Sequence, residues 1–259
     1  MKTPGFSMLM LVVVLCLLLG PYVILLAASF GERALLQFPP QGFTLSWYSK
    51  LFGMRMFIDA LKTSLLIGIA STLTGMVFGV PAAYATARFT SRGKGLVKLI
   101  FLSPAIVPGL VIGYSLLRFF VLIGGFPILI GLYLGHVVLV FPYTIRVVLA
   151  SLKNLDPSID EAAISLGATP WKVFFRVVLP NIRSGIIAAF ILAFITSFNN
   201  VPVSMFLTGP GVTMLPVQML SYVEYYYDPT IAALSTLLIL LTVVIVQIVE
   251  KTLGLSQYF

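Results

Sequence analysis

The sequence has few of the residues that most catalytic and metal-binding sites need. Its 259 residues include one cysteine and one histidine, and Asp and Glu together number eight. The lone cysteine, Cys16, excludes an intrachain disulfide, and one cysteine with one histidine excludes a zinc site of the Cys/His type. No nucleophile, base and orienting acid are spaced for covalent chemistry. We therefore expect no catalytic residue, no metal site and no cofactor bound by this chain.

Two further absences concern a source of energy. The phosphate-binding pattern GxxxxGK[ST] occurs nowhere in the chain. None of the acidic residues falls in the middle of an apolar run, although a proton-coupled carrier usually needs such a buried carboxylate. If this chain moves a solute against a gradient, the energy must come from another protein.

What the chain has in abundance is apolar sequence. Hydrophobic residues make up 59% and charged residues 9%, and the mean hydropathy is +1.08, which is far from the soluble average. The apolar runs predict an all-α integral membrane protein with about six transmembrane helices. The expected spans are residues 7–29, 63–87, 97–123, 126–152, 186–207 and 231–249.

The placement of Lys and Arg predicts the orientation, and the formal charge of +8 follows from short basic loops rather than from nucleic-acid binding. The more basic side comprises Lys2, Arg88, Arg92, Lys94, Lys98, Arg146, Lys153, Lys172, Arg176, Arg183 and Lys251. The less basic side comprises Arg33, Lys50, Arg55, Lys62 and Arg118. Both termini are therefore expected in the cytoplasm of a bacterium, with the chain in the inner (plasma) membrane.

The expected organisation follows from these spans. Residues 1–30 form an N-terminal transmembrane helix, residues 31–61 a periplasmic loop, and residues 62–250 a core of five transmembrane helices. A cytoplasmic segment, 153–181, interrupts this core, and residues 251–259 form a cytoplasmic tail.

The stretch 155–181, LDPSIDEAAISLGATPWKVFFRVVLPN, differs from the rest because it is amphipathic and charged. Asp156 and Pro157 predict a helix start, and Gly167 suits the left-handed residue that ends a helix. Ile159, Ala162, Ala163 and Leu166 fall on one face of that helix. Thr169-Pro170 predicts a second short helix, with Trp171, Phe174 and Val178 on one side, that Pro180 and Asn181 break. The pattern alone fits either an interfacial helix pair on lipid headgroups or a protein-docking element.

The residues of this stretch favour docking. It contains Glu161-Ala162-Ala163, and Gly167 follows after three residues. After nine further residues comes Val177, and after one more residue Leu179-Pro180. This pattern resembles the "EAA" signature of permease subunits of ATP-binding-cassette (ABC) importers. The chain as a whole is most similar to permeases of the spermidine/putrescine type. The resemblance implies the type I ABC importer permease fold, with the stretch 155–181 acting as a coupling helix. The implied ATPase-coupling residues are Glu161, Ala162, Ala163, Gly167, Trp171, Phe174, Leu179 and Pro180.

The resemblance also implies partners. They are a second permease subunit, identical or homologous, two cytoplasmic ATPase subunits that bind ATP and Mg, and a periplasmic or lipid-anchored substrate-binding protein. The chain itself is then no enzyme, and nucleic acid is no partner. A channel or secondary transporter with a merely interfacial helix pair stays as the alternative.

The substrate is expected to be a small polar solute, with a polyamine as the first hypothesis. Spermidine-type permeases often carry acidic residues late in the fifth helix, whereas this chain has Asn199 and Asn200 there. An amide can hydrogen-bond a solute but cannot neutralise a polyamine. A γ-amino acid, an aminophosphonate or ferric ion is therefore the next hypothesis. The candidate substrate-path residues are Ser103, Tyr114, Ser115, Asn199, Asn200 and Ser204.

Overall fold

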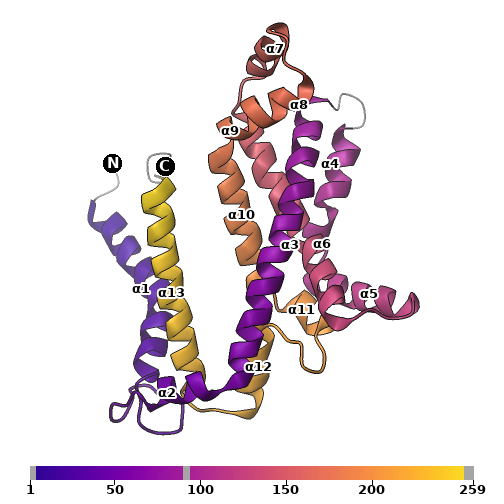
Figure 1. Ribbon diagram of the computed structural model, residues 1–259. Helices are drawn as coiled ribbons and strands as arrows, with labels where there is room; N and C mark the ends of the chain where they lie inside the picture. The colour runs from indigo at the N-terminus through magenta and orange to yellow at the C-terminus, as the bar shows by residue number, and fades with distance from the viewer. Residues whose placement is uncertain (1–3, 90–93, 254–259) are drawn as a thin grey trace. The chain divides into compact units, whose positions relative to one another are not determined.

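The computed structural model describes residues 4–89 and 94–253, and within these ranges the chain is helical with no β-strand (Figure 1). This confirms the all-α fold. The helices are α1 (Pro4–Ala28), α2 (Ser46–Gly53), α3 (Arg55–Arg88), α4 (Lys94–Leu102), α5 (Gly109–Leu122), α6 (Ile128–Lys153), α7 (Ser158–Ser165), α8 (Pro170–Val173), α9 (Leu179–Asn181), α10 (Arg183–Phe198), α11 (Pro202–Leu207), α12 (Leu215–Tyr225) and α13 (Thr230–Leu253). A 3₁₀ turn, Ser103–Ala105, follows α4, and a π-helical segment, Phe174–Val178, joins α8 to α9.

The chain divides into two compact units, of which the first comprises Met1–Ile58 with Met219–Phe259. In this unit α13 packs against α1 and α2. Lys50 of α2 forms an ion pair with Asp228 (Nζ–Oδ2 2.6 Å), and Asp228 also accepts a hydrogen bond from the hydroxyl of Tyr222. The Trp47 ring nitrogen donates to the carbonyl of Gly31 at 2.7 Å. Polar contacts therefore fix the loops of this unit.

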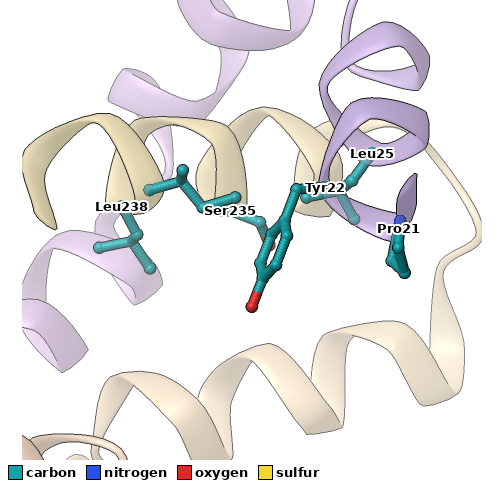
Figure 2. A pocket seen from close by; sticks show the side chains of 6 residues that line it. Pro21, Tyr22, Leu25, Ser235 and Leu238 are labelled. Atoms are coloured by element: carbon teal, nitrogen blue, oxygen red, sulfur yellow. The ribbon is translucent and has the colours of Figure 1, made fainter. Parts of the chain in front are cut away.

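An open apolar depression of about 350 Å³ lies between α1 and α13. Figure 2 shows the side chains of Tyr22 and Leu25 from α1 and of Ser235 and Leu238 from α13 around it. None of the candidate substrate-path residues is among the residues that line this depression.

The second unit, Asp59–Gln218, contains the larger core. Helix α6 packs along α10, and α11 packs on α5 and α6. Glycines let helices approach closely. A Cβ atom at Gly75 would lie 2.9 Å from Val140 Cγ2, and one at Gly79 would lie 2.8 Å from Thr144 Cγ2. These glycines therefore set the separation of α3 from α6.

The apolar helices differ in detail from the six expected spans. Three of the described helices are long and apolar enough to cross a membrane by themselves: Gly5–Ala28, Arg55–Arg88 and Ile128–Lys153. A fourth span is possible if the pair Pro170–Asn181 and Arg183–Phe198, bent by 75°, counts as one, and Gly109–Leu122 and Thr230–Ile245 are shorter apolar helices. The first, second and fourth expected spans are thus continuous helices.

Prolines explain two of the differences. The third expected span is broken between α4 and α5, because Pro104 lies in the 3₁₀ turn and Pro108, with ψ 134°, precedes α5. Figure 1 shows α5 running crosswise to α6. The fifth expected span is broken between α10 and α11, where Pro202 begins a new helix. Proline lacks the amide hydrogen that a helix interior uses, and each of these two breaks contains a proline. Helices α1, α3 and α6, in contrast, continue through Pro21, Pro81 and Pro142.

The boundary of the expected periplasmic loop, 31–61, also differs. This segment contains helix α2, and α3 begins at Arg55 rather than at residue 63. The apolar pattern missed the start of α3 because its first turns carry Arg55, Asp59 and Lys62. Of the basic residues used for orientation, Lys2 and Arg92 lie outside the described residues, as do residues 254–259 of the expected tail.

Candidate functional site

Residues 155–181, hereafter the knob, lie at the end of the second unit where α3 and α6 end (Figure 1). Its first helix, α7, begins and ends as the sequence predicts. The Ser158 amide donates to Asp156 Oδ1 at 2.9 Å, and this hydrogen bond lowers the pKa of the exposed Asp156 carboxyl. Gly167 has φ +85°, the left-handed conformation that glycine adopts most easily. Its amide donates to the carbonyl of Ile164 at 2.8 Å and closes the helix.

The inner face of α7 differs from the face that the apolar pattern indicates. Asp160 is 7% exposed, and Ala163 packs against the core, whereas Leu166 is 89% exposed. Ile159 is also exposed, at 37%. The expected apolar face is therefore turned largely outward, because an ion pair rather than an apolar contact holds Asp160 inside.

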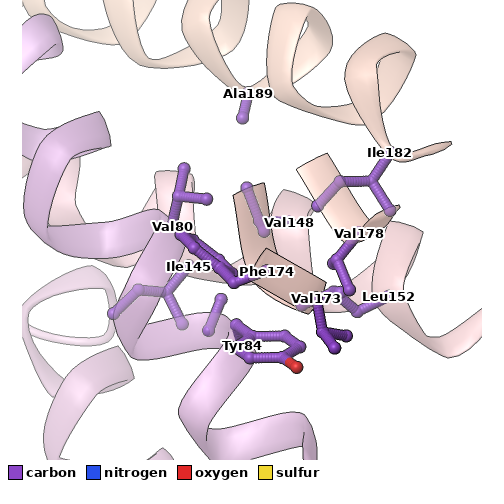
Figure 3. Packing of buried hydrophobic residues seen from close by; sticks show 11 residues of the cluster. Val80, Tyr84, Ile145, Val148, Leu152, Val173, Phe174, Val178, Ile182 and Ala189 are labelled. Carbon is purple, nitrogen blue, oxygen red and sulfur yellow. The ribbon is translucent and has the colours of Figure 1, made fainter. Parts of the chain in front are cut away.

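The second helix of the knob is not a uniform α-helix. Thr169 precedes Pro170, which begins α8, and Phe174–Val178 then forms a π-helical turn. Val173, Phe174 and Val178 are buried in a core cluster that also contains Tyr84 of α3 (Figure 3). Single π-helical turns inside helices are frequent at functional sites.

Trp171 and Phe174 do not share a side as predicted. Phe174 is 6% exposed and its ring centroid lies 5.0 Å from that of Tyr84, whereas Trp171 is 73% exposed and stacks on Phe175 at 6.1 Å. Trp171 lies in the first turn of α8 and outside the core cluster that receives Phe174. The expectation that Trp171 and Phe174 lie on one side of the helix is therefore wrong.

The outer surface of the knob carries large apolar side chains. Ile164, Leu166, Trp171 and Phe175 are 53%, 89%, 73% and 57% exposed. Glu161 and Ala162 are exposed on the same knob. A group of exposed apolar residues on a part that also carries charges marks an interaction surface.

The knob ends at Leu179 and Pro180. Leu179 packs against the core cluster, and Pro180 is exposed. The side-chain nitrogen Nδ2 of Asn181 donates to the carbonyl of Val177 at 2.7 Å. The chain then bends by 75° into α10. These residues therefore set the angle at which the knob meets the next apolar helix.

One feature of the knob has no signal in the sequence pattern. Arg88, the last residue of α3, forms a largely buried ion pair with Asp160 (Nε–Oδ2 2.9 Å). The sequence pattern placed Arg88 among the basic residues that predict the orientation of the chain. Residues so far apart along the chain leave no local spacing from which their pairing could be predicted.

A second polar cluster lies in the apolar part of the unit. His136 is fully buried, with Nδ1 2.7 Å from Ser197 Oγ and Nε2 3.0 Å from Ser204 Oγ. The Ser204 hydroxyl donates to the carbonyl of Asn200 at 2.5 Å, so it accepts the hydrogen of Nε2. Ser71 Oγ lies 3.3 Å from Ser197 Oγ. This cluster joins α3, α6, α10 and α11 across the break between α10 and α11.

The candidate substrate-path residues occupy different environments. Asn200 accepts a hydrogen bond from the amide of Val203 (2.9 Å) and so caps α11, and Ser204 is buried in the histidine cluster. Tyr114 of α5 contacts Phe206 of α11 (6.1 Å between ring centroids) and is exposed, as are Ser115 and Asn199. Ser103 is exposed and donates to the carbonyl of Ile100.

These placements divide the candidates. The packing of α5 on α11 brings the helix of Tyr114 and Ser115 beside the helix of Ser204. Ser103 lies apart from them in the 3₁₀ turn after α4. The side chains of Asn200 and Ser204 already form hydrogen bonds within the fold. Asn199, Tyr114 and Ser115 remain as exposed candidates, together with the separate Ser103.

The chain consists of apolar helices, carries an exposed knob with an EAA-type pattern, and has no nucleotide-binding pattern. These features define a class, the membrane-embedded subunit of a transporter driven by another protein. Comparison with known proteins confirms this class. Residues 75–254 match the family described as "Binding-protein-dependent transport system inner membrane component". The chain belongs to this family and is a permease subunit of an ABC importer.

Two relatives from Escherichia coli K12 illustrate the similarity. The putrescine transport system permease protein PotI is 34% identical over 229 residues, which cover 86% of this chain and 81% of that protein. The spermidine/putrescine transport system permease protein PotC is 32% identical over 229 residues, which cover 87% and 85%.

Solved structures share the fold. A chain of a bacterial ABC transporter involved in the import of alginate aligns with a TM-score of 0.75 at 17% identity, covering 95% of this chain and 94% of that one. A chain of the MetNI methionine ABC transporter aligns with a TM-score of 0.60 at 21% identity, covering 78% and 96%. Permeases of this kind work with ATPase and substrate-binding partners, and ATP is hydrolysed by the separate ATPase rather than by this chain.

Proposed function

We propose that the knob is the coupling element that docks in an ATPase subunit on the cytoplasmic side. The observation that carries this proposal is the outward orientation of Leu166 and Trp171, with exposed fractions of 89% and 73%. Apolar residues of this size would be shielded by a partner, and aromatic residues are enriched among those that dominate binding energy at interfaces. The same knob carries Glu161, Ala162, Ala163 and Gly167, which match the EAA signature.

The proposed assembly has two permease subunits, two ATPase subunits and one substrate-binding protein. Two permease subunits, this chain with a copy of itself or a homologue, would surround the path, and an ATPase subunit would dock on each knob. ATP and Mg would bind only in the ATPase subunits. When ATP draws these subunits together, the knobs would move and switch the permease pair from inward-open to outward-open. A periplasmic or lipid-anchored binding protein would deliver the solute.

The orientation belongs to the same proposal. The chain would lie in the bacterial inner membrane with both termini in the cytoplasm, supported by the excess of Lys and Arg on the knob side. In the structure Lys153, Lys172, Arg176 and Arg183 are exposed, so they are free to lie at a membrane–water boundary.

For the solute we propose a polyamine, supported by the putrescine and spermidine/putrescine systems to which the two relatives belong. The buried Asp160 and the half-buried Asp228 are each paired with a cation, and Asn199 stands where the resemblance leads us to expect an acid. Recognition of the charge of the polyamine would therefore rest mainly with the binding protein, while Asn199, Tyr114 and Ser115 would line a less selective path.

One reconstitution tests docking and solute together. The chain, its partner permease subunit and the neighbouring ATPase are purified and placed in liposomes with the binding protein. We expect the ATPase to co-purify and labelled putrescine or spermidine to accumulate only with ATP. Uptake of 4-aminobutyrate, an aminophosphonate or ferric ion without polyamine uptake would contradict the solute assignment. Failure of the ATPase to bind the wild-type chain would contradict docking.

A further inference from the structure

The ion pair between Arg88 and Asp160 joins the knob to a long apolar helix. Arg88 is the last residue of α3, and Asp160 lies in the first turn of α7. Their side chains are 11% and 10% exposed, with Arg88 Nε 2.9 Å from Asp160 Oδ2. Arginine has a planar fork of donors, so its bond to a carboxylate fixes direction as well as distance.

Two more hydrogen bonds converge on this pair. Arg88 Nη2 donates to the carbonyl of Leu155 at 3.0 Å, and the Tyr84 hydroxyl donates to Asp160 Oδ2 at 3.3 Å. Tyr84 and Arg88 both belong to α3, while Leu155 precedes α7 and Asp160 is within it. The start of α7 is therefore bonded to the end of α3 at two points and cannot slide along α3 without breaking these bonds.

The arrangement is costly in free energy. Asp160 Oδ1 is buried and has no hydrogen-bond partner among the described residues. A buried ion pair often stabilises a fold no better than apolar residues of the same volume, and a lone buried oxygen adds a penalty. Stability alone therefore does not account for placing this pair at the junction.

We propose that Arg88 and Asp160 are positioning residues that carry displacement of the knob into α3. The proposal rests on the proposed docking of the knob on an ATPase. Ile164 and Leu166 lie on or next to α7 and are exposed, while Asp160 on the same helix is held by α3. A partner that binds the exposed residues and moves α7 would therefore displace α3 through this ion pair.

The test measures coupling rather than activity alone. The complete complex with its ATPase and binding protein is reconstituted in liposomes, and solute uptake and ATP hydrolysis are recorded together. For Asp160→Asn we expect the ATPase subunit to stay bound and solute transported per ATP to fall roughly tenfold, within the range typical of coupling between sites. A merely structural role would instead lower the amount of complex and leave the ratio unchanged.

A double variant keeps the test informative if the single variant folds poorly. Arg88→Met with Asp160→Leu replaces the pair by apolar side chains, a change that buried ion pairs often tolerate. We expect this variant to assemble, to hydrolyse ATP and to transport poorly per ATP. The matched control is Asp59→Asn, which removes the exposed pair of Asp59 and Lys62 (3.8 Å) on α3 and should leave the ratio unchanged.

The possible failures are distinguishable. A normal ratio of solute to ATP in the double variant would overturn transmission through the ion pair and leave docking intact. Loss of ATPase binding in both variants, with wild-type binding preserved, would also overturn it, because the pair would then only shape the knob. Absence of ATPase binding in the wild type would overturn the proposed docking itself.

Discussion

The ring of Phe174 lies 5.0 Å from the ring of Tyr84, and this contact joins the knob to α3 close to the ion pair of Arg88 and Asp160. Within the same short helical segment Trp171 is 73% exposed. One aromatic residue therefore faces the chain's own core, and its neighbour faces outward. This division separates residues that hold the knob from residues that are available to a partner.

Phe174→Ala is expected to destabilise the second unit by about 3–5 kcal/mol, because it removes a buried aromatic side chain and leaves a cavity beside Val173 and Tyr84. Denaturant unfolding in detergent or lipid measures this change. Phe175→Ala is the matched control, since Phe175 is 57% exposed and its loss should change stability little. Equal destabilisation by the two substitutions would show that Phe174 is not an anchor.

Trp171→Ala is expected to leave the stability of the isolated chain within about 0.5 kcal/mol of the wild type. Its affinity for the ATPase subunit should fall by about 2 kcal/mol or more, as for an aromatic residue central to an interface. Titration of the purified ATPase onto the chain in nanodiscs measures the affinity. Phe52→Ala, an exposed aromatic on α2, serves as the control and should bind normally. Undiminished binding by Trp171→Ala would contradict its docking role.

Gly167→Ala tests the end of α7. No atom lies within 4 Å of a Cβ built at Gly167, but φ is +85°, so the substitution strains the backbone without a clash. The expected cost is about 1 kcal/mol, with a measurable loss of transport per ATP because the angle between α7 and α8 changes. Gly211→Ala is the control, since Gly211 has φ +75° and is equally free of neighbours. If the two variants transport equally well, Gly167 has no special role in the knob.

The ion pair of Lys50 and Asp228 predicts the pH dependence of the first unit. Burial raises the pKa of Asp228, but hydrogen bonds from Lys50, Thr230 and Tyr222 outweigh burial and leave that pKa below its ordinary value. The hydrogen bond with Asp228 raises the pKa of Lys50. A carboxyl whose pKa is lower in the folded state stabilises the fold at pH values above its pKa in the unfolded state. That contribution is lost as the pH falls through the folded-state pKa.

The midpoint temperature of thermal unfolding should therefore change little between about pH 5 and 9 and should fall below about pH 4. Asp228→Asn should lower the midpoint at neutral pH and weaken the acid decline, whereas Asp59→Asn, at an exposed pair, should do neither. An unchanged midpoint for Asp228→Asn at pH 7 would contradict a stabilising role for the pair.

The sequence predicted those features that depend on local chemistry. Asp156 and Gly167 mark the ends of α7 because capping and a left-handed turn involve only adjacent residues. The apolar spans were evident from composition, although prolines at 104, 108 and 202 divided two of them. The spacing from Glu161 to Pro180 predicted the family, which the comparisons confirm.

Features that depend on contacts between distant segments could not be predicted. Helical periodicity placed Leu166 on the apolar side of α7, but the bond between Asp160 and Arg88 turns that side outward. The separation of Trp171 from Phe174 reflects the contact of Phe174 with Tyr84 of α3, and a contact between such distant residues has no local pattern. The contact of Ser204 beside the break between α10 and α11 likewise requires His136 from another helix.

The most direct measurement places a photo-crosslinking amino acid at position 166 in place of Leu166, the most exposed large apolar residue of the knob, in the assembled transporter. We expect a crosslink to the ATPase subunit whose yield changes when ATP is bound. A crosslink to lipid alone, or labelling of a Leu166→Cys variant by a thiol reagent confined to the outside of the cell, would contradict the coupling role of the knob.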